Sequence, residues 1–98
     1  MTGAVEILRE ASVQLPHLCE EGVDFRRALE LNYRVRKVAE SLITLSRDRE
    51  DVLKRAVDIY MRLGDNYQLL DVSPELAVET LNEVVCELEK LVRELGYR

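Results

Sequence analysis

The two residues best suited to covalent chemistry are His17 and Cys19. A cysteine becomes a nucleophile when a nearby base favours its thiolate, and His17, the only histidine in the chain, lies two positions away. If this segment forms a helical turn, residues two positions apart point to different sides. We therefore interpret Cys19 as a small apolar residue beneath a connecting segment. A small enzyme built on this pair is the least favoured of three functional hypotheses.

Cys19 and Cys86 are the only cysteines in the chain of 98 residues. With one histidine they match none of the usual zinc-ligand spacings, and no glutamate is followed by histidine three positions later, as a di-iron bundle requires. We therefore predict no metal ion and no other cofactor. The first nine residues lack the order of a signal peptide, and no apolar run is long enough to span a membrane. These features predict a cytoplasmic protein with no membrane contact, and they favour two reduced thiols over the alternative of a disulfide between Cys19 and Cys86.

Phosphate-binding loops and catalytic carboxylates have no clear sequence signature here. The four glycines, Gly3, Gly22, Gly64 and Gly96, are isolated, and each lies near the end of a predicted helix. The acidic side chains fall on helix faces opposite the apolar positions, where a solvated surface is the ordinary interpretation. We predict no catalytic residues and a protein that is not an enzyme.

The charges are unevenly distributed along the chain, although the net charge is −5. Residues 26–62 carry ten Arg or Lys against six acids, whereas both ends of the chain are acidic. A basic stripe could contact phosphates if the second and third helices are neighbours. Its residues would be Arg26, Arg27, Arg34, Lys37, Arg47, Arg49, Lys54 and Arg55. The favoured alternative is that these side chains neutralise acidic neighbours within the fold.

The elements that would position these residues are helices, because apolar residues recur at spacings of three and four. The first helix is predicted over 2–15, with Thr2 as its candidate N-cap. Pro16 is expected to interrupt it, since the residue before a proline avoids the helical region. The segment 16–22 is then a separate turn that Gly22 closes.

The second and third helices are predicted from their caps and stops. Asp24 is the candidate cap of the second helix, which extends over 24–45. The polar run that follows contains Asp48, the candidate cap of the third helix. Gly64 is expected to end that helix, with a loop over 65–67.

The fourth helix has the clearest start signal in the chain. Ser73 is a candidate N-cap, Pro74 suits the first helical position, and an acid follows in the first turn. Gly96 is expected to close the helix. Two sets of apolar positions between Leu76 and Leu95 give it a stripe of double width, which predicts a central helix and a contact with a second copy of the chain.

Two asparagines lie close to the apolar side of long helices, Asn32 in the second and Asn82 in the fourth. A polar residue at a helix interface can fix register at some cost in stability. We favour the alternative, that both point to solvent at the border of the apolar face.

Three segments give the chain a resemblance to a known family: 34–40 (RVRKVAE), 50–59 (EDVLKRAVDI) and 72–74 (VSP) leading into the last helix. Their order resembles that in an uncharacterised family of small archaeal all-helical proteins, over roughly residues 30 to 92. In that family two arginine-bearing helices, each opened by a proline, flank an alanine-rich helix. Here Asn32 stands at the place of the first proline. The resemblance implies a compact four-helix fold and an archaeal source, and it assigns no function.

Together these patterns predict a single all-α domain over residues 1–98, an antiparallel four-helix bundle. Residues 4–7 read much like residues 56–59, which leaves open that the bundle consists of two similar helical hairpins. The leading functional hypothesis is a non-enzymatic protein–protein interaction or assembly module whose fourth helix contacts a second copy of the chain, as a homodimer, or another protein. The alternatives are a nucleic-acid-binding accessory protein that uses the basic middle helices, and the small enzyme.

Overall fold

The computed structural model describes residues 3–96 and contains four α-helices. They are α1 (Ala4–Glu21), α2 (Ala28–Leu45), α3 (Glu50–Val72) and α4 (Pro74–Glu94), and a short 3₁₀ helix, η1 (Phe25–Arg27), precedes α2. The predicted all-α four-helix bundle is thus confirmed. Thr2, the candidate N-cap of the first helix, lies outside the described residues, and Gly3 occupies the N-cap position.

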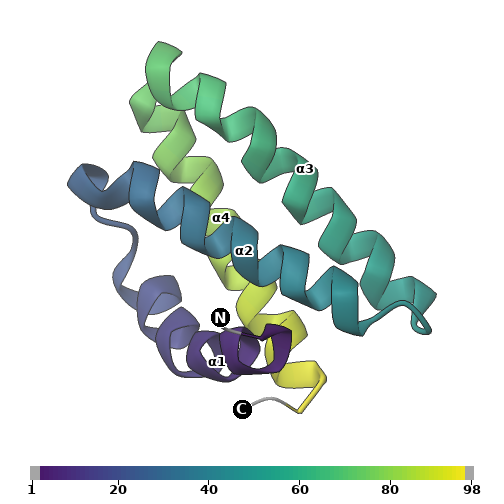
Figure 1. Ribbon diagram of the computed structural model, residues 1–98. Helices are drawn as coiled ribbons and strands as arrows, with labels where there is room; N and C mark the ends of the chain where they lie inside the picture. The colour runs from purple at the N-terminus through teal and green to yellow at the C-terminus, as the bar shows by residue number, and fades with distance from the viewer. Residues whose placement is uncertain (1–2, 97–98) are drawn as a thin grey trace.

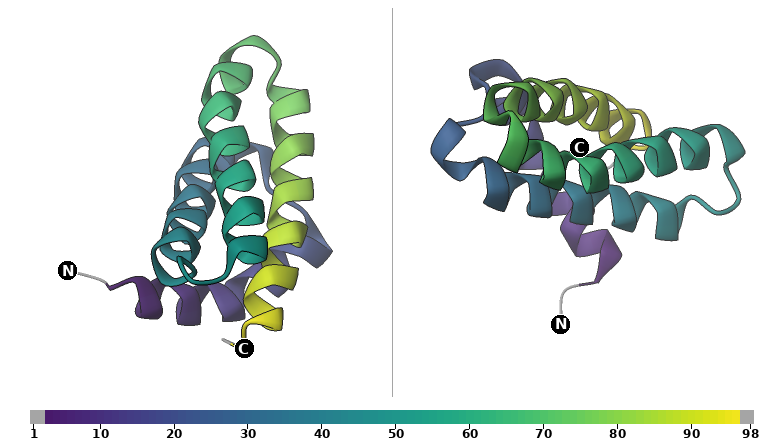
Figure 2. Two further views of the ribbon diagram at one scale, coloured as in Figure 1. Left: turned by 90° about the vertical axis from the view of Figure 1, so that its right-hand side faces the viewer. Right: turned by 90° about the horizontal axis from the view of Figure 1, so that it is seen from above.

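Three helices run alongside one another and the first lies across them. α2, α3 and α4 alternate in direction, whereas α1 crosses at one end of this layer (Figures 1 and 2). α1 packs against α2 and α4, and within residues 3–96 it makes no contact with α3. α4 contacts all three other helices. The most extensive packing is between α2 and α3 and between α1 and α4, not within two separate hairpins. α1 and α2 cross while α3 and α4 run side by side (Figures 1 and 2), and an internal duplication stays a prediction.

The core between these helices is aliphatic, as the composition predicts. Its buried cluster consists of Leu, Val, Ala and Ile side chains from all four helices. α4 contributes Leu81, Val84, Val85, Leu88, Leu91 and Val92. Aliphatic side chains of this size pack well between helices about 8–10 Å apart.

The predicted stop at Pro16 is wrong, because α1 continues through this residue to Glu21. A proline in a helix removes one backbone hydrogen bond and usually disrupts the helix. Here buried Leu15 and the flanking Leu18, which packs on the core, hold the second half of the helix against the bundle. The helix ends where the sequence predicts, at Gly22, which has a φ of 84° and donates its N–H to Leu18 O at 2.9 Å.

The predicted boundaries of the two middle helices are also partly wrong. Asp24 accepts a hydrogen bond from Arg26 N at 3.0 Å and so caps η1, and α2 begins only at Ala28. α3 begins at Glu50 with Arg49 in the N-cap position, so Asp48 is not its cap.

The predicted stop at Gly64 and the loop over 65–67 are wrong, since α3 continues to Val72. Asn66 of the expected loop is buried, and Leu70, one turn further on, packs against the core. Tertiary contacts of this kind override the weak helix propensity of glycine and asparagine. The start of α4 at Pro74 and its end before Gly96 are confirmed, although in the described structure the Ser73 side chain makes no cap hydrogen bond.

A glycine suits position 64 in the middle of α3 because the Arg36 side chain of α2 lies against it. A Cβ atom at residue 64 would be 2.9 Å from Arg36 Nη2. Arg36 Nε donates to Tyr60 O at 3.2 Å, and the guanidinium carbon lies 3.9 Å from the centroid of the Tyr60 ring. The glycine therefore makes room for a polar and cation–π contact between α2 and α3.

Substituting Gly64→Ala is expected to destabilise the protein by about 1 kcal/mol, although alanine is the better helix former by about the same amount. The added methyl group displaces the guanidinium, which loses its hydrogen bond and ring contact. Urea denaturation gives the change in unfolding free energy. In an Arg36→Ala background the same substitution is expected to stabilise, and a stabilising effect in the natural background would contradict this explanation.

Candidate interaction surface

The two cysteines form a disulfide, Cys19–Cys86, which links the last turns of α1 to α4. The prediction of two reduced thiols is therefore wrong. Packing of α1 across α4 brings the two Cα atoms to 4.9 Å, although 67 positions separate them in the chain. His17 is exposed on α1, and the neighbouring sulfur is bonded to Cys86. The hypothesis of an enzyme using Cys19 and His17 thus lacks its nucleophile.

Asn32 is fully buried, so the prediction that it points to solvent is wrong. Its Nδ2 donates to Leu63 O at 3.0 Å, and its Oδ1 accepts from Asn66 Nδ2 at 2.9 Å. Asn66 also donates to Ala77 O at 3.1 Å. These amides connect α2, α3 and α4 through the core. The sequence offered no signal for this network, because Asn66 was expected in a loop.

Asn82 is half-buried and has a structural role on the other side of α4. Its Oδ1 accepts a hydrogen bond from Val23 N at 2.7 Å. Val23 lies in the connection between α1 and η1, where its backbone N–H has no helical partner. The border position predicted for Asn82 is consistent with its partial exposure, but its side chain is bonded to the protein.

The wide apolar stripe of α4 is covered within the chain. Most of its residues are buried, with relative exposures of at most 1 % for Leu81, Leu88 and Leu91. The stripe needs double width because α4 packs against three helices, not one. α4 is thus the central helix that the sequence predicts. The width of the stripe no longer supports a homodimer contact on this helix.

Most of the predicted basic stripe pairs with acids of the same chain. Six of its eight residues form ion pairs, which are Arg27 and Arg34 with Glu30, Lys37 with Glu40, Arg49 with Asp51, Lys54 with Glu50, and Arg55 with Glu94. Within residues 3–96, Arg26 and Arg47 have no such ion pair. The pairs are exposed and each adds little stability, but their five carboxylates offset more than half of the stripe's positive charge. This arrangement matches the favoured alternative of internal neutralisation.

Five of the ten large apolar side chains that are exposed among the described residues lie on η1 and on the bodies of α2 and α3; the other five lie on α1, at the ends of α2 and α3, and at the start of α4. Leu29 and Tyr33 are 64 % and 57 % exposed, and with Phe25 they are spaced by four residues. On α3, Val57 and Met61 are also exposed and lie one helical turn apart. Tyr60 lies between them in the sequence. We call the surface formed by Phe25, Leu29, Tyr33, Val57 and Met61 the α2–α3 face.

The Arg36 contact with Tyr60 places the two halves of this face next to each other. Tyr33, Arg36, Lys37 and Glu40 of α2 and Tyr60 and Tyr67 of α3 line a hollow of about 130 Å³ between the helices. Residues three and four positions apart share a helix side, so Leu29 lies beside Tyr33, and Met61 beside Val57. The spacing of 25, 29 and 33 was visible in the sequence, but these residues fall on a side whose other members are charged.

Comparisons with protein-family models, with characterised proteins and with solved structures find no match to this chain. The resemblance to small archaeal helical proteins therefore stays a prediction. Among residues 3–96, no group of three or more His, Cys, Asp or Glu side chains is placed to hold a metal ion. In the same part of the chain, no helix is sufficiently long and apolar to cross a membrane.

Proposed function

We propose that this protein is a non-enzymatic interaction module that forms a homodimer through the α2–α3 face. The observation that carries the proposal is the concentration of five large exposed apolar side chains on adjacent helices. Exposed apolar patches on small soluble domains commonly mark protein–protein contacts, and aromatic residues and Met are enriched in such interfaces. The predicted contact on α4 is replaced by this surface, because α4 is covered by its neighbours.

A second copy of the chain suits this face because charges of both signs surround it. Lys37 pairs with Glu40 and Lys54 pairs with Glu50, so acids and bases alternate beside the apolar residues. In a two-fold symmetric contact the same patch meets itself, and a patch of one sign would repel its copy. A small chain also has a limited core, and association adds buried apolar area.

A nucleic-acid-binding role has weaker support. Phosphate contacts need unneutralised Arg and Lys side chains, and the ion pairs above engage six of the eight stripe residues. The net charge of −5 adds a long-range repulsion of phosphates.

The disulfide restricts the cytoplasmic location predicted from the sequence to a cytoplasm in which disulfides persist. Disulfides are rare in most cytosols but common in intracellular proteins of hyperthermophilic archaea and bacteria. We propose that the chain resides in a cytoplasm of that kind, in accord with the archaeal source that the family resemblance implies.

Substituting Leu29→Lys is expected to raise the dimer dissociation constant at least about 30-fold, the effect of losing about 2 kcal/mol at an interface centre. The substitution places an unpaired ammonium in an apolar contact. Sedimentation equilibrium on the oxidised chain measures the constant. Val13→Lys is the matched control, because Val13 is 67 % exposed on α1, outside the α2–α3 face.

The control variant is expected to dimerise as the natural chain does. A strict monomer at micromolar concentration, or equal weakening by both substitutions, would contradict the proposal. Salt-sensitive binding of RNA or DNA by the natural chain would instead favour the nucleic-acid role.

A further inference from the structure

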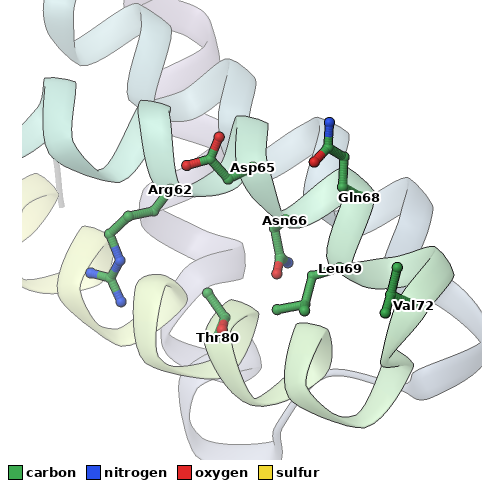
Figure 3. Close-up of a pocket in the computed structure, with 7 residues that line it drawn as sticks. All are labelled: Arg62, Asp65, Asn66, Gln68, Leu69, Val72 and Thr80. Carbon is green, nitrogen blue, oxygen red and sulfur yellow. The ribbon is translucent and has the colours of Figure 1, made fainter.

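A groove between α3 and α4 lies apart from the α2–α3 face, at the end of the hairpin that these helices form. It has a volume of about 470 Å³. Figure 3 shows its lining, which consists of Arg62, Asp65, Asn66, Gln68, Leu69 and Val72 from α3 and Thr80 from α4. The Asn66 side chain points from α3 toward α4, with Leu69 beside it and Thr80 across from it (Figure 3). The groove thus combines apolar side chains with a few polar groups, as small-molecule sites do.

Asn66 brings an unused hydrogen-bond acceptor to this groove. The residue is only 2 % exposed, and its Oδ1 has no hydrogen-bond partner among residues 3–96. The orientation of the amide is fixed, since Nδ2 donates to both Asn32 Oδ1 and Ala77 O. Rotating the amide by half a turn would set its oxygen against two other acceptors. A buried acceptor without a donor is costly, and a ligand that supplies an N–H removes this cost.

The charges around the groove favour a cation. Arg62 is the only basic residue of the lining, and its guanidinium lies within ion-pair distance of three carboxylates, those of Asp58, Glu83 and Glu87. Asp65 adds a fourth carboxylate and forms no ion pair within the described residues. The groove also includes the last turn of α3, which contains no basic residue. Carbonyl groups at a helix C-terminus carry partial negative charge and attract cations.

We propose that this groove binds a small primary alkylammonium ion. The ammonium donates a hydrogen bond to Asn66 Oδ1 and lies near Asp65, while the alkyl chain packs on Val72. The oxygen is buried, so the ligand reaches it when the half-buried Leu69 side chain adopts another rotamer. The size of the groove and its one buried acceptor without a donor fit a ligand with one donor-bearing head and a short apolar chain.

NMR titration of the oxidised, ¹⁵N-labelled chain with n-butylammonium chloride tests the proposal. We expect saturable shifts of the Asn66 side-chain amide and of the Leu69 and Thr80 backbone amides, with a dissociation constant in the millimolar range. Butyltrimethylammonium is the matched probe, because it carries the same charge but no N–H donor. It is expected to bind about tenfold more weakly, the value of one hydrogen bond between a charged and a neutral group.

Two variants test separately the charge of Asp65 and the access that Leu69 controls, and neither changes the hydrogen bonds between the buried amides. Asp65→Asn removes an exposed charge at the groove and is expected to weaken binding about two- to threefold. Leu69→Ala opens access to Asn66 Oδ1 and is expected to strengthen binding. Equal affinity for the two cations, shifts that sodium chloride reproduces, or a long-lived water at Asn66 with no response to the amine would each overturn the proposal.

Discussion

Reduction of the Cys19–Cys86 disulfide is expected to lower the free energy of unfolding by about 4 kcal/mol. The bond closes a loop across 67 positions, and a cross-link over such a distance removes much of the conformational freedom of the unfolded chain. A domain of this size has a total stability of about 5–15 kcal/mol, so the loss is a large part of it.

Urea denaturation of the oxidised chain, with and without a reducing agent, measures this loss. The double substitution Cys19→Ser with Cys86→Ser is expected to give the same reduced stability, and it serves as the control because a reducing agent has nothing to act on. A difference below about 1 kcal/mol between oxidised and reduced chains would show that the bundle does not depend on the bond.

The substitution Asn32→Asp is expected to cost at least about 3 kcal/mol at pH 7, because it places a carboxylate in the core without a cationic partner. It also removes the donor to Leu63 O. Burial raises the pKa of the introduced carboxyl above its value in the unfolded chain, about 4. The variant is therefore most stable, relative to the natural chain, below about pH 4, and it loses stability as the pH rises through the folded-state pKa.

We propose to measure the unfolding free energies of the variant and the natural chain from about pH 3.5 to about pH 7.5, a range that brackets these pKa values. The difference between the two chains is expected to grow as the pH rises. Asn82→Asp is the matched control. It makes the same chemical change at a half-buried residue whose oxygen already accepts from Val23 N, so the bond is preserved. A small, pH-independent loss for Asn32→Asp would contradict the role of Asn32 as a buried donor.

The sequence predicted the fold class and most helix faces because these depend on the spacing of apolar residues. The start of α4 was predictable for the same reason, since Ser73 and Pro74 are local signals. The errors arose where distant contacts override local preference. Pro16 and Gly64 disfavour a helix by themselves, yet packing of α1 on the bundle and of the residues that follow Gly64 in α3 keeps both within helices.

The candidate sites were harder to predict because they depend on which helices become neighbours. The disulfide needs α1 to cross α4, and the Asn32 network needs Asn66 to be helical and buried. The width of the α4 stripe was visible in the sequence, but its meaning depended on the number of helices that cover it. Three neighbours explain the width without a second copy.

The position of the disulfide also determines the covalent connectivity of the molecule. All three connections between the α-helices, at 22–27, at 46–49 and at Ser73, lie between Cys19 and Cys86. The oxidised chain is therefore a closed ring with two tails, and each interhelical loop belongs to the ring. A single proteolytic cut in any of these loops opens the ring and leaves one covalently connected molecule, in which all four helices stay joined.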